Sequence, residues 1–341
     1  MEKKEKLFYL NFIRAISMII IVTYHFFVHF AENNIVGTSI INDKWGKIGV
    51  ALFFMISGAA LMYNYNEKLD IKKYAKKRII GIYPMFWIAY ILAYIFIFCT
   101  TKSCNIWGLP FWKIIFSVFG MDGYLGYYTP TMYILGEWFL GCIIIIYILF
   151  PILRILVNKY PKITIIVATI IYLLTFIFYN SNLKMPLDKT IIVSCYAFLL
   201  GMYAIKLPKI KLWQMIIALA IAGVGYFINV ENENLKIFIC KTTAYFMFFV
   251  FAYIGQQISI DIIKIIINKI SKYSYAIFLT HHFLIIKIEN FFQNQTYGII
   301  GTILLYITCW IAIIIATKVI YKINKSILDL LTQDKQNLLT N

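Results

Sequence analysis

The chain has 341 residues, of which 62% are hydrophobic and only 14% are charged, and its formal net charge is +17. A soluble domain usually carries about 25% charged residues. Here the hydrophobic residues form long runs, among them 10–30, 136–152 and 299–315. About 20 apolar residues cross the bilayer core, so the composition excludes a soluble protein and predicts an all-α integral membrane protein.

About ten transmembrane helices are predicted along the chain. In order they cover residues 8–30, 46–64, 79–99, 132–153, 163–179, 190–206, 211–229, 236–257, 272–291 and 298–321. The first is too long for a signal peptide and has no small-residue cleavage site after it. The aromatic-rich segment 100–131 has two open interpretations, an interfacial helix near 110–119 or a belt of anchoring side chains at the headgroups.

The basic residues indicate the topology. If the N-terminus is cytoplasmic, the inner segments hold 22 basic and seven acidic residues, whereas the outer segments hold nine basic and eight acidic residues. This is the positive-inside distribution. We therefore expect both termini in the cytoplasm of a multi-pass plasma-membrane protein, in contact with lipid and not with nucleic acid.

One membrane domain, residues 1–325, and a short polar cytoplasmic tail, residues 326–341, account for the whole chain. The six cysteines have no metal-ligand spacing, and no metal is predicted. The oligomeric state is left open.

Two ionisable residues lie inside the first predicted span. Arg14 and His25 are eleven residues apart, which is close to three helical turns, so they share one face with about 16 Å between them. His29 extends this face by one turn. Charged groups in a membrane are costly and commonly functional. The alternative is that Arg14 reaches the inner headgroups and His25 is an ordinary core histidine.

Five segments resemble the acyltransferase-3 family, in the family's order. The first, LNFIRAISMIIIVTYHFF, has the arginine and, after ten further residues, the histidine of that family's first helix. The others are GVALFFMISGAAL, YAKKRIIGIYPMFW, EWFLGCIIIIYILFP and SKYSYAIFLTHHFLI, and the five are spread from residue 10 to residue 285. Three family positions differ, because Gly81 replaces an arginine and Ala51 and Ile143 replace acidic residues. No fused esterase-like domain is expected, as in the stand-alone branch.

The resemblance implies an enzyme, an O-acyltransferase of the class that transfers acyl groups other than amino-acyl groups. The donor implied is cytoplasmic acetyl-CoA or another acyl-CoA, and the acceptor is a hydroxyl of an extracytoplasmic or lipid-linked glycan. His25 is expected to be the general base, and Arg14 to hold the donor or stabilise developing charge. An acyl-histidine intermediate stays open.

Six further residues receive expected roles. Lys77 and Arg78 are expected to meet the coenzyme phosphates, with ordinary positive-inside charge as the alternative. Ser57 is expected to contact the donor or, with Gly58, only to pack helices. Glu137 is expected to orient His25 or bind the acceptor, or else to lie in the interface. His281 and Trp138 are expected on the acceptor side, whereas His282, on another helix face, is not expected in the site.

A transporter or flippase of a lipid-linked saccharide is the competing function. It shares the number of spans, but it favours helices broken by Gly or Pro at mid-membrane, and Pro84 and Pro151 lie near span ends. The acceptor sugar and the acyl group are not encoded in any motif. The richness in Ile, Lys and Asn suggests a bacterial source.

Overall fold

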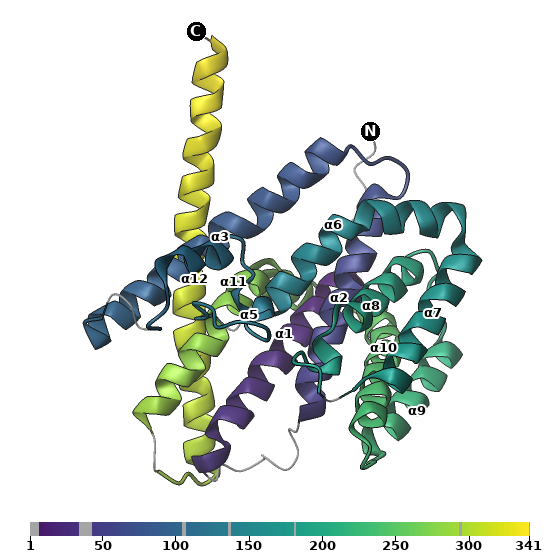
Figure 1. Cartoon of the computed structure of the whole chain (residues 1–341). Coiled ribbons are helices and arrows are strands. Elements are labelled where there is room, and N and C mark those ends of the chain that lie inside the picture. Colours follow the sequence, from purple (N-terminus) through teal and green to yellow (C-terminus); the bar gives the residue numbers. More distant parts are fainter. Residues whose placement is uncertain are drawn as a thin grey trace.

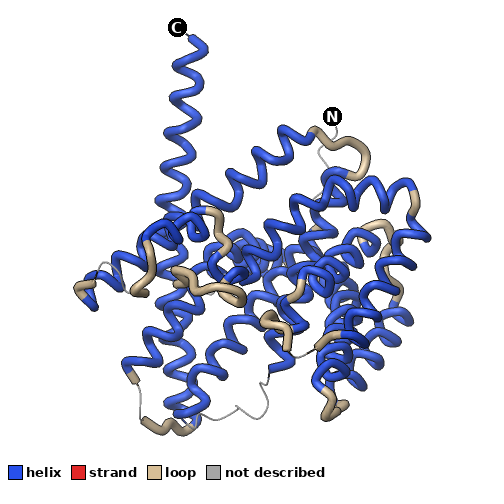
Figure 2. The backbone as a smooth tube through the Cα atoms, viewed as in Figure 1, coloured by secondary structure: helices blue, strands red, loops and turns tan. Residues whose placement is uncertain are grey.

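The computed structural model describes residues 7–33, 43–103, 107–135, 138–180, 182–292 and 295–340. All regular elements in these residues are helices, and they contain no strand (Figures 1 and 2). Within these residues, seven helices are long and apolar enough to cross a membrane. The prediction of an all-α integral membrane protein is therefore confirmed.

Ten helices of 14 or more residues occupy the described part of the chain, one for each predicted segment. They are α1 (Phe8–His29), α2 (Asp43–Tyr65), α3 (Ile71–Thr101), α6 (Trp138–Lys159), α7 (Pro161–Phe178), α8 (Ile191–Ala204), α9 (Leu212–Phe227), α10 (Glu233–Gln257), α11 (Asp261–Phe291) and α12 (Ile299–Thr340). Of these, α8, α9 and α11 fall outside the seven clear spans. The number of crossings and the cytoplasmic termini stay predictions.

Several helices are longer than the hydrophobic runs that predicted them. Helix α3 begins at Ile71, not at residue 79, because the carboxylate of Asp70 caps it by accepting the Lys73 N–H at 3.0 Å. Helix α12 continues through residue 325 to Thr340 and projects beyond the bundle (Figure 1). Hydropathy marks where a helix can contact lipid, whereas backbone hydrogen bonding continues into polar sequence.

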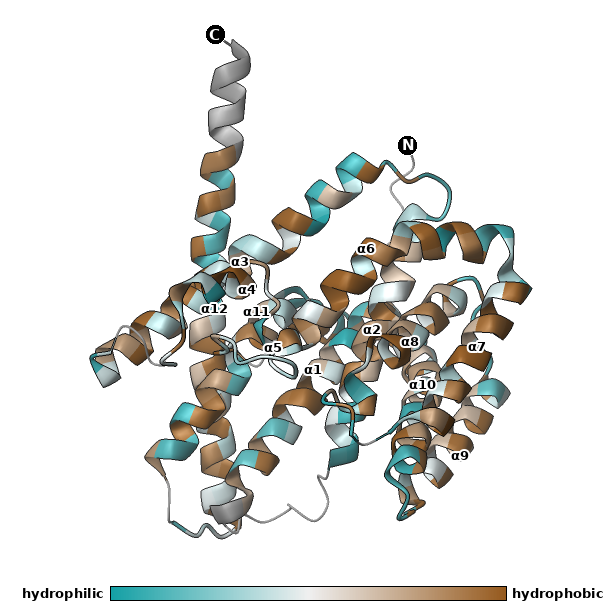
Figure 3. Ribbon diagram, in the orientation of Figure 1, coloured by the Kyte–Doolittle hydropathy of each residue, from teal (hydrophilic) through white to brown (hydrophobic). Residues whose placement is uncertain are grey.

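The outward helix faces are apolar, as a membrane requires. Helix α7 exposes Ile163, Ile166 and Ile170, and hydrophobic colours cover much of α6, α7 and α9 (Figure 3). Hydrophobic side chains lie inside as well, so neither face of these helices is suited to water. This pattern matches a bundle that has lipid as its surrounding solvent.

Helices α2 and α8 approach each other through glycines. A Cβ built on Gly58 would lie 1.9 Å from the carbonyl oxygen of Phe198, and one built on Gly201 would lie 1.9 Å from that of Met55. Only glycine permits this backbone contact, so the predicted packing role of Gly58 is confirmed. The contact fixes the position of the neighbouring Ser57, which faces away from α8 into the bundle.

The aromatic-rich segment between α3 and α6 is partly helical. It contains η2 (Phe111–Lys113), α4 (Ile114–Val118) and α5 (Asp122–Leu125), which confirms the helix expected near 110–119. The indole N–H of Trp87 on α3 donates to the carbonyl of Val118 at 2.9 Å. A left-handed turn at Gly120, with φ of +66°, redirects the chain from α4 into α5. The segment therefore packs on α3 and covers the start of α6.

Candidate active site

A cavity of about 380 Å³ lies between helices α1, α2, α3, α6 and α11. Much of its wall is apolar, from residues such as Ile21, Phe53 and Phe278. The polar and aromatic part of the wall is formed by Arg14, His25, Ser57, Arg78, Trp138, Tyr147, Ser271, Lys272, Ser274, Tyr275 and His281. An enclosed space that combines apolar walls with a few convergent polar groups is typical of a site for a small molecule or cofactor.

Arg14 and His25 both line this cavity. Helix α1 is regular from Phe8 to His29, so their spacing of eleven residues places them on one side, as predicted. The five helices around the cavity bring the guanidinium and the imidazole into one space. The two side chains therefore line a common cavity, and the face that they share on α1 is turned into the helical bundle.

The two guanidinium groups of the wall have no carboxylate partner among the described residues. Arg14 Nη1 donates to Ser271 Oγ over a long 3.5 Å. Arg78 lies against the rings of Tyr74 and Tyr147, at 5.9 and 5.6 Å from their centroids, and its Nε is buried without a hydrogen-bond partner. Both positive charges are therefore available to an anionic ligand or to developing negative charge.

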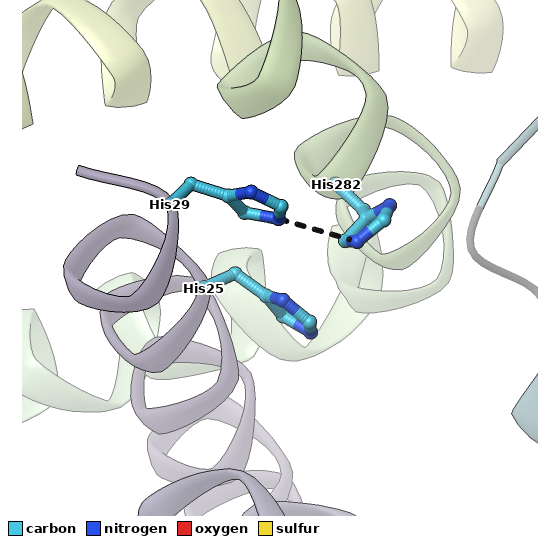
Figure 4. Close-up of side chains that lie close together, drawn as sticks. All are labelled: His25, His29 and His282. Atoms are coloured by element: carbon cyan, nitrogen blue, oxygen red, sulfur yellow. Dashed lines mark hydrogen bonds between the residues drawn. The ribbon is translucent and has the colours of Figure 1, made fainter. Parts of the chain in front are cut away.

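All four histidines of the chain lie close together where α11 packs along α1, and His25 and His281 line the cavity there. The ring of His25 lies 5.1 Å from that of His281 and 4.8 Å from that of His282, between centroids. His29 Nε2 lies 3.4 Å from His282 Nε2 (Figure 4). His282 is not part of the cavity wall, but its ring contacts that of His25, which does line the cavity. Side chains of adjacent residues point in different directions from a helix. Because α11 packs along α1, His281 faces the cavity and His282 contacts the last turn of α1.

The hydrogen bonds of His281 define its tautomer. Nδ1 lies 3.1 Å from the carbonyl oxygen of Ile277 and 2.8 Å from that of Phe278. A carbonyl oxygen only accepts, so Nδ1 must carry the proton, and Nε2 of the neutral ring is then an acceptor. This Nε2 is buried and has no partner. A lone pair therefore remains for a ligand in the cavity, whose wall includes His281.

The other predicted residues divide between the cavity and the surface. Ser57 and Trp138 line the cavity. Lys77 is exposed and does not belong to the wall, although its neighbour Arg78 does. Glu137 lies outside the described residues.

Tyr147 and Ser271 are among the wall residues to which the sequence pattern assigned no role, although both lie in the segments that resemble the family. Tyr147 holds one side of Arg78, and its backbone carbonyl accepts the Tyr74 hydroxyl at 2.8 Å. Ser271 contacts Arg14 and donates to Asn11 Oδ1 at 3.1 Å. Their polar groups within largely apolar helices were the available signal.

Comparisons with known proteins indicate an acyltransferase. Residues 7–320 match a protein family described as an acyltransferase domain. The chain is also similar to acyltransferase MdmB of Streptomyces mycarofaciens, with 25% identity over 134 residues, which are 37% of this chain and 33% of that protein. The chain thus matches about a third of the length of this relative. No solved structure matches the chain.

Proposed function

This chain belongs to the acyltransferase-3 family, and from that premise we propose that it is an O-acyltransferase that moves an acyl group, most simply acetyl, from acyl-CoA to a glycan hydroxyl. The supporting observation is the single cavity lined by Arg14, His25 and His281. A transporter of lipid-linked saccharide shares the helical bundle, but family membership favours the transferase.

The donor is assigned to the inner part of the cavity. Arg78 and the exposed Lys77 contact the coenzyme phosphates there, because both lie near the start of α3 on the side expected to be cytoplasmic. Ser57 contacts the pantetheine arm from α2. Arg14 holds the arm or the thioester oxygen with a guanidinium that no carboxylate neutralises, and such charge-assisted contacts are among the stronger hydrogen bonds.

Acyl transfer at this site needs one base and one charge stabiliser. The acceptor hydroxyl oxygen attacks the thioester carbon while His25 takes the hydroxyl proton. The new carbon–oxygen bond forms, the carbon–sulfur bond breaks, and the coenzyme thiolate leaves and regains a proton from the histidine. A positioned base of this kind contributes about 10²–10⁴-fold to the rate.

The acceptor is assigned to the outer part of the cavity, which fits an extracytoplasmic or lipid-linked glycan. The free Nε2 of His281 accepts a hydrogen bond from a sugar hydroxyl. The indole of Trp138, at the first turn of α6, offers a flat apolar face to the sugar ring. Glu137, beside it in the chain, orients His25 or the acceptor. The location proposed is the plasma membrane of a bacterium.

Replacing His25 tests this proposal, and His29 supplies the matched control. His29 is an imidazole one turn further along α1 and is not part of the cavity wall. Membranes that contain each variant are given labelled acetyl-CoA and cell envelopes from the source organism, and label in the glycan is measured. We expect His25→Ala to lose at least about 100-fold and His29→Ala to remain active. A folded, abundant His25→Ala protein with full activity would refute the proposal.

A further inference from the structure

Three imidazoles form a compact group beside the cavity, and of the three only His25 lines the cavity. His25 and His29 come from the last turns of α1, and His282 comes from α11 (Figure 4). One ring nitrogen from each can be chosen so that all three lie within 4.8 Å of one another. Among the residues that the structure describes, this group contains histidines only, without a thiolate or carboxylate.

The distances fit coordination of one metal ion. Zinc binds imidazole nitrogen at about 2.0–2.1 Å with tetrahedral angles, so two nitrogens on one ion lie about 3.3–3.4 Å apart. The Nε2 atoms of His29 and His282 are 3.4 Å apart. His25 and His29 are also four residues apart on one helix, the spacing with which paired histidines of zinc enzymes face a common ion. The third nitrogen, at most 4.8 Å from the other two, needs to approach by up to about 1.4 Å to reach that spacing, which is within the reach of a ring rotation.

We propose that His25, His29 and His282 bind a divalent transition-metal ion, with Zn²⁺ as the best fit. Neutral imidazole suits zinc, copper and nickel, whereas magnesium and calcium require oxygen ligands. Three histidines also leave a fourth position open to water. The sequence did not reveal this site, because the third ligand comes from a helix more than 250 residues away from the first two.

Metal binding and acyl transfer compete for His25. This consequence rests on the proposed function, since a ring nitrogen that ligates zinc has no lone pair left for the hydroxyl proton. Lys189 interacts electrostatically with both His25 and His282, and its positive charge opposes a bound cation. We therefore assign the ion a reversible, inhibitory role and not that of a permanent cofactor.

Binding is tested on the full chain, purified in detergent with an affinity tag that contains no histidine. Zn²⁺ alone is titrated by calorimetry into chelator-treated protein. Wild type should bind one ion per chain, and His29→Gln and His282→Gln should each weaken binding by more than about 100-fold, because loss of an outer-shell partner alone costs 10–100-fold. His281→Asn is the matched control, an adjacent histidine outside the triad, and should bind as wild type does.

Copper provides a second measurement of the same site. Bound Cu²⁺ should show nitrogen hyperfine coupling in electron paramagnetic resonance, and each triad variant should reduce it. Size-exclusion profiles and thermal unfolding establish that the variants are folded. If His29→Gln is not folded, His29→Asn is used in its place. The proposal is overturned if folded wild type binds no zinc, or if both triad variants bind it as tightly as wild type.

An activity measurement separates this site from the proposed function. Zinc should inhibit acetyl transfer by wild type, whereas His29→Gln should keep basal transfer and resist zinc. Binding with the predicted variant pattern but without inhibition would support the metal site and refute His25 as the base. Inhibition that is equal in wild type and His29→Gln would contradict the inhibitory role assigned to the triad.

Discussion

Two substitutions at His281 separate the donor and the acceptor nitrogen of its ring. Asparagine places an amide near Nδ1 and can keep the contact with the carbonyl groups of Ile277 and Phe278, at 3.1 and 2.8 Å in the wild type. It leaves nothing at Nε2. Glutamine places its amide oxygen near Nε2 and keeps an acceptor there. The acceptor role therefore predicts that glutamine is the milder change.

The size of the effect follows from one buried hydrogen bond. Leaving a buried polar group unsatisfied costs about 1–3 kcal/mol, which corresponds to roughly 5- to 150-fold in rate. We expect His281→Asn to lower kcat/KM for the glycan acceptor by this factor and to leave KM for acetyl-CoA unchanged. His281→Gln should retain activity within about tenfold of wild type.

The assay is transfer of labelled acetyl groups at varied acceptor and fixed, saturating acetyl-CoA, with thermal unfolding as a check on folding. Equal loss in both variants would show that the ring matters only for packing. Full activity of His281→Asn would refute the role of Nε2 in acceptor binding.

Three further predictions concern the donor, the packing and the outer segment. Arg78→Ala should raise KM for acyl-CoA by about tenfold or more, since a hydrogen bond to a charged group contributes about 1.5–3 kcal/mol. Lys77 is exposed, so Lys77→Ala should change this KM less than about fivefold. Equal effects of the two variants would contradict the assignment of Arg78 to the coenzyme phosphates. Gly58→Ala should lower stability in detergent by about 1–3 kcal/mol, because its Cβ would lie 1.9 Å from a backbone oxygen. The control Gly223→Ala, whose Cβ would have no atom within 4 Å, should leave stability unchanged. A Gly58→Ala protein as stable as wild type would refute the close contact between α2 and α8. Burial raises the pKa of Asp122 from 3.8 to about 6, so between these values the folded chain keeps a proton that the unfolded chain releases. The free energy of unfolding should therefore fall by up to about 3 kcal/mol as the pH rises from 4 to 6. Thermal unfolding of Asp122→Asn should not show that decline.

The features that the sequence predicted well are local ones. Arg14 and His25 belong to one helix, so their common face follows from 3.6 residues per turn and needs no knowledge of the neighbouring helices. The number of long helices follows in the same way from separate apolar runs. The ends of these helices do not follow from the apolar runs, because Asp70 caps α3 in a polar stretch that hydropathy assigns to a loop.

The features that the sequence did not predict depend on contacts between helices. His281 and His282 are adjacent on α11, and periodicity alone predicts that only one of them faces the site. Both approach His25, because the packing of α11 along α1 sets which side chains meet. The free Nε2 of His281 is likewise a property of a folded hydrogen-bond network, since it follows from the carbonyl oxygens on Nδ1.

The most direct measurement is a cryo-electron microscopy structure of the chain with a non-reactive thioether analogue of acetyl-CoA. The account predicts density for the acyl end within hydrogen-bond reach of His25, with the pantetheine arm along Arg14 and the phosphates beside Arg78. An analogue bound outside the cavity between α1, α2, α3, α6 and α11, with that cavity empty, would contradict it.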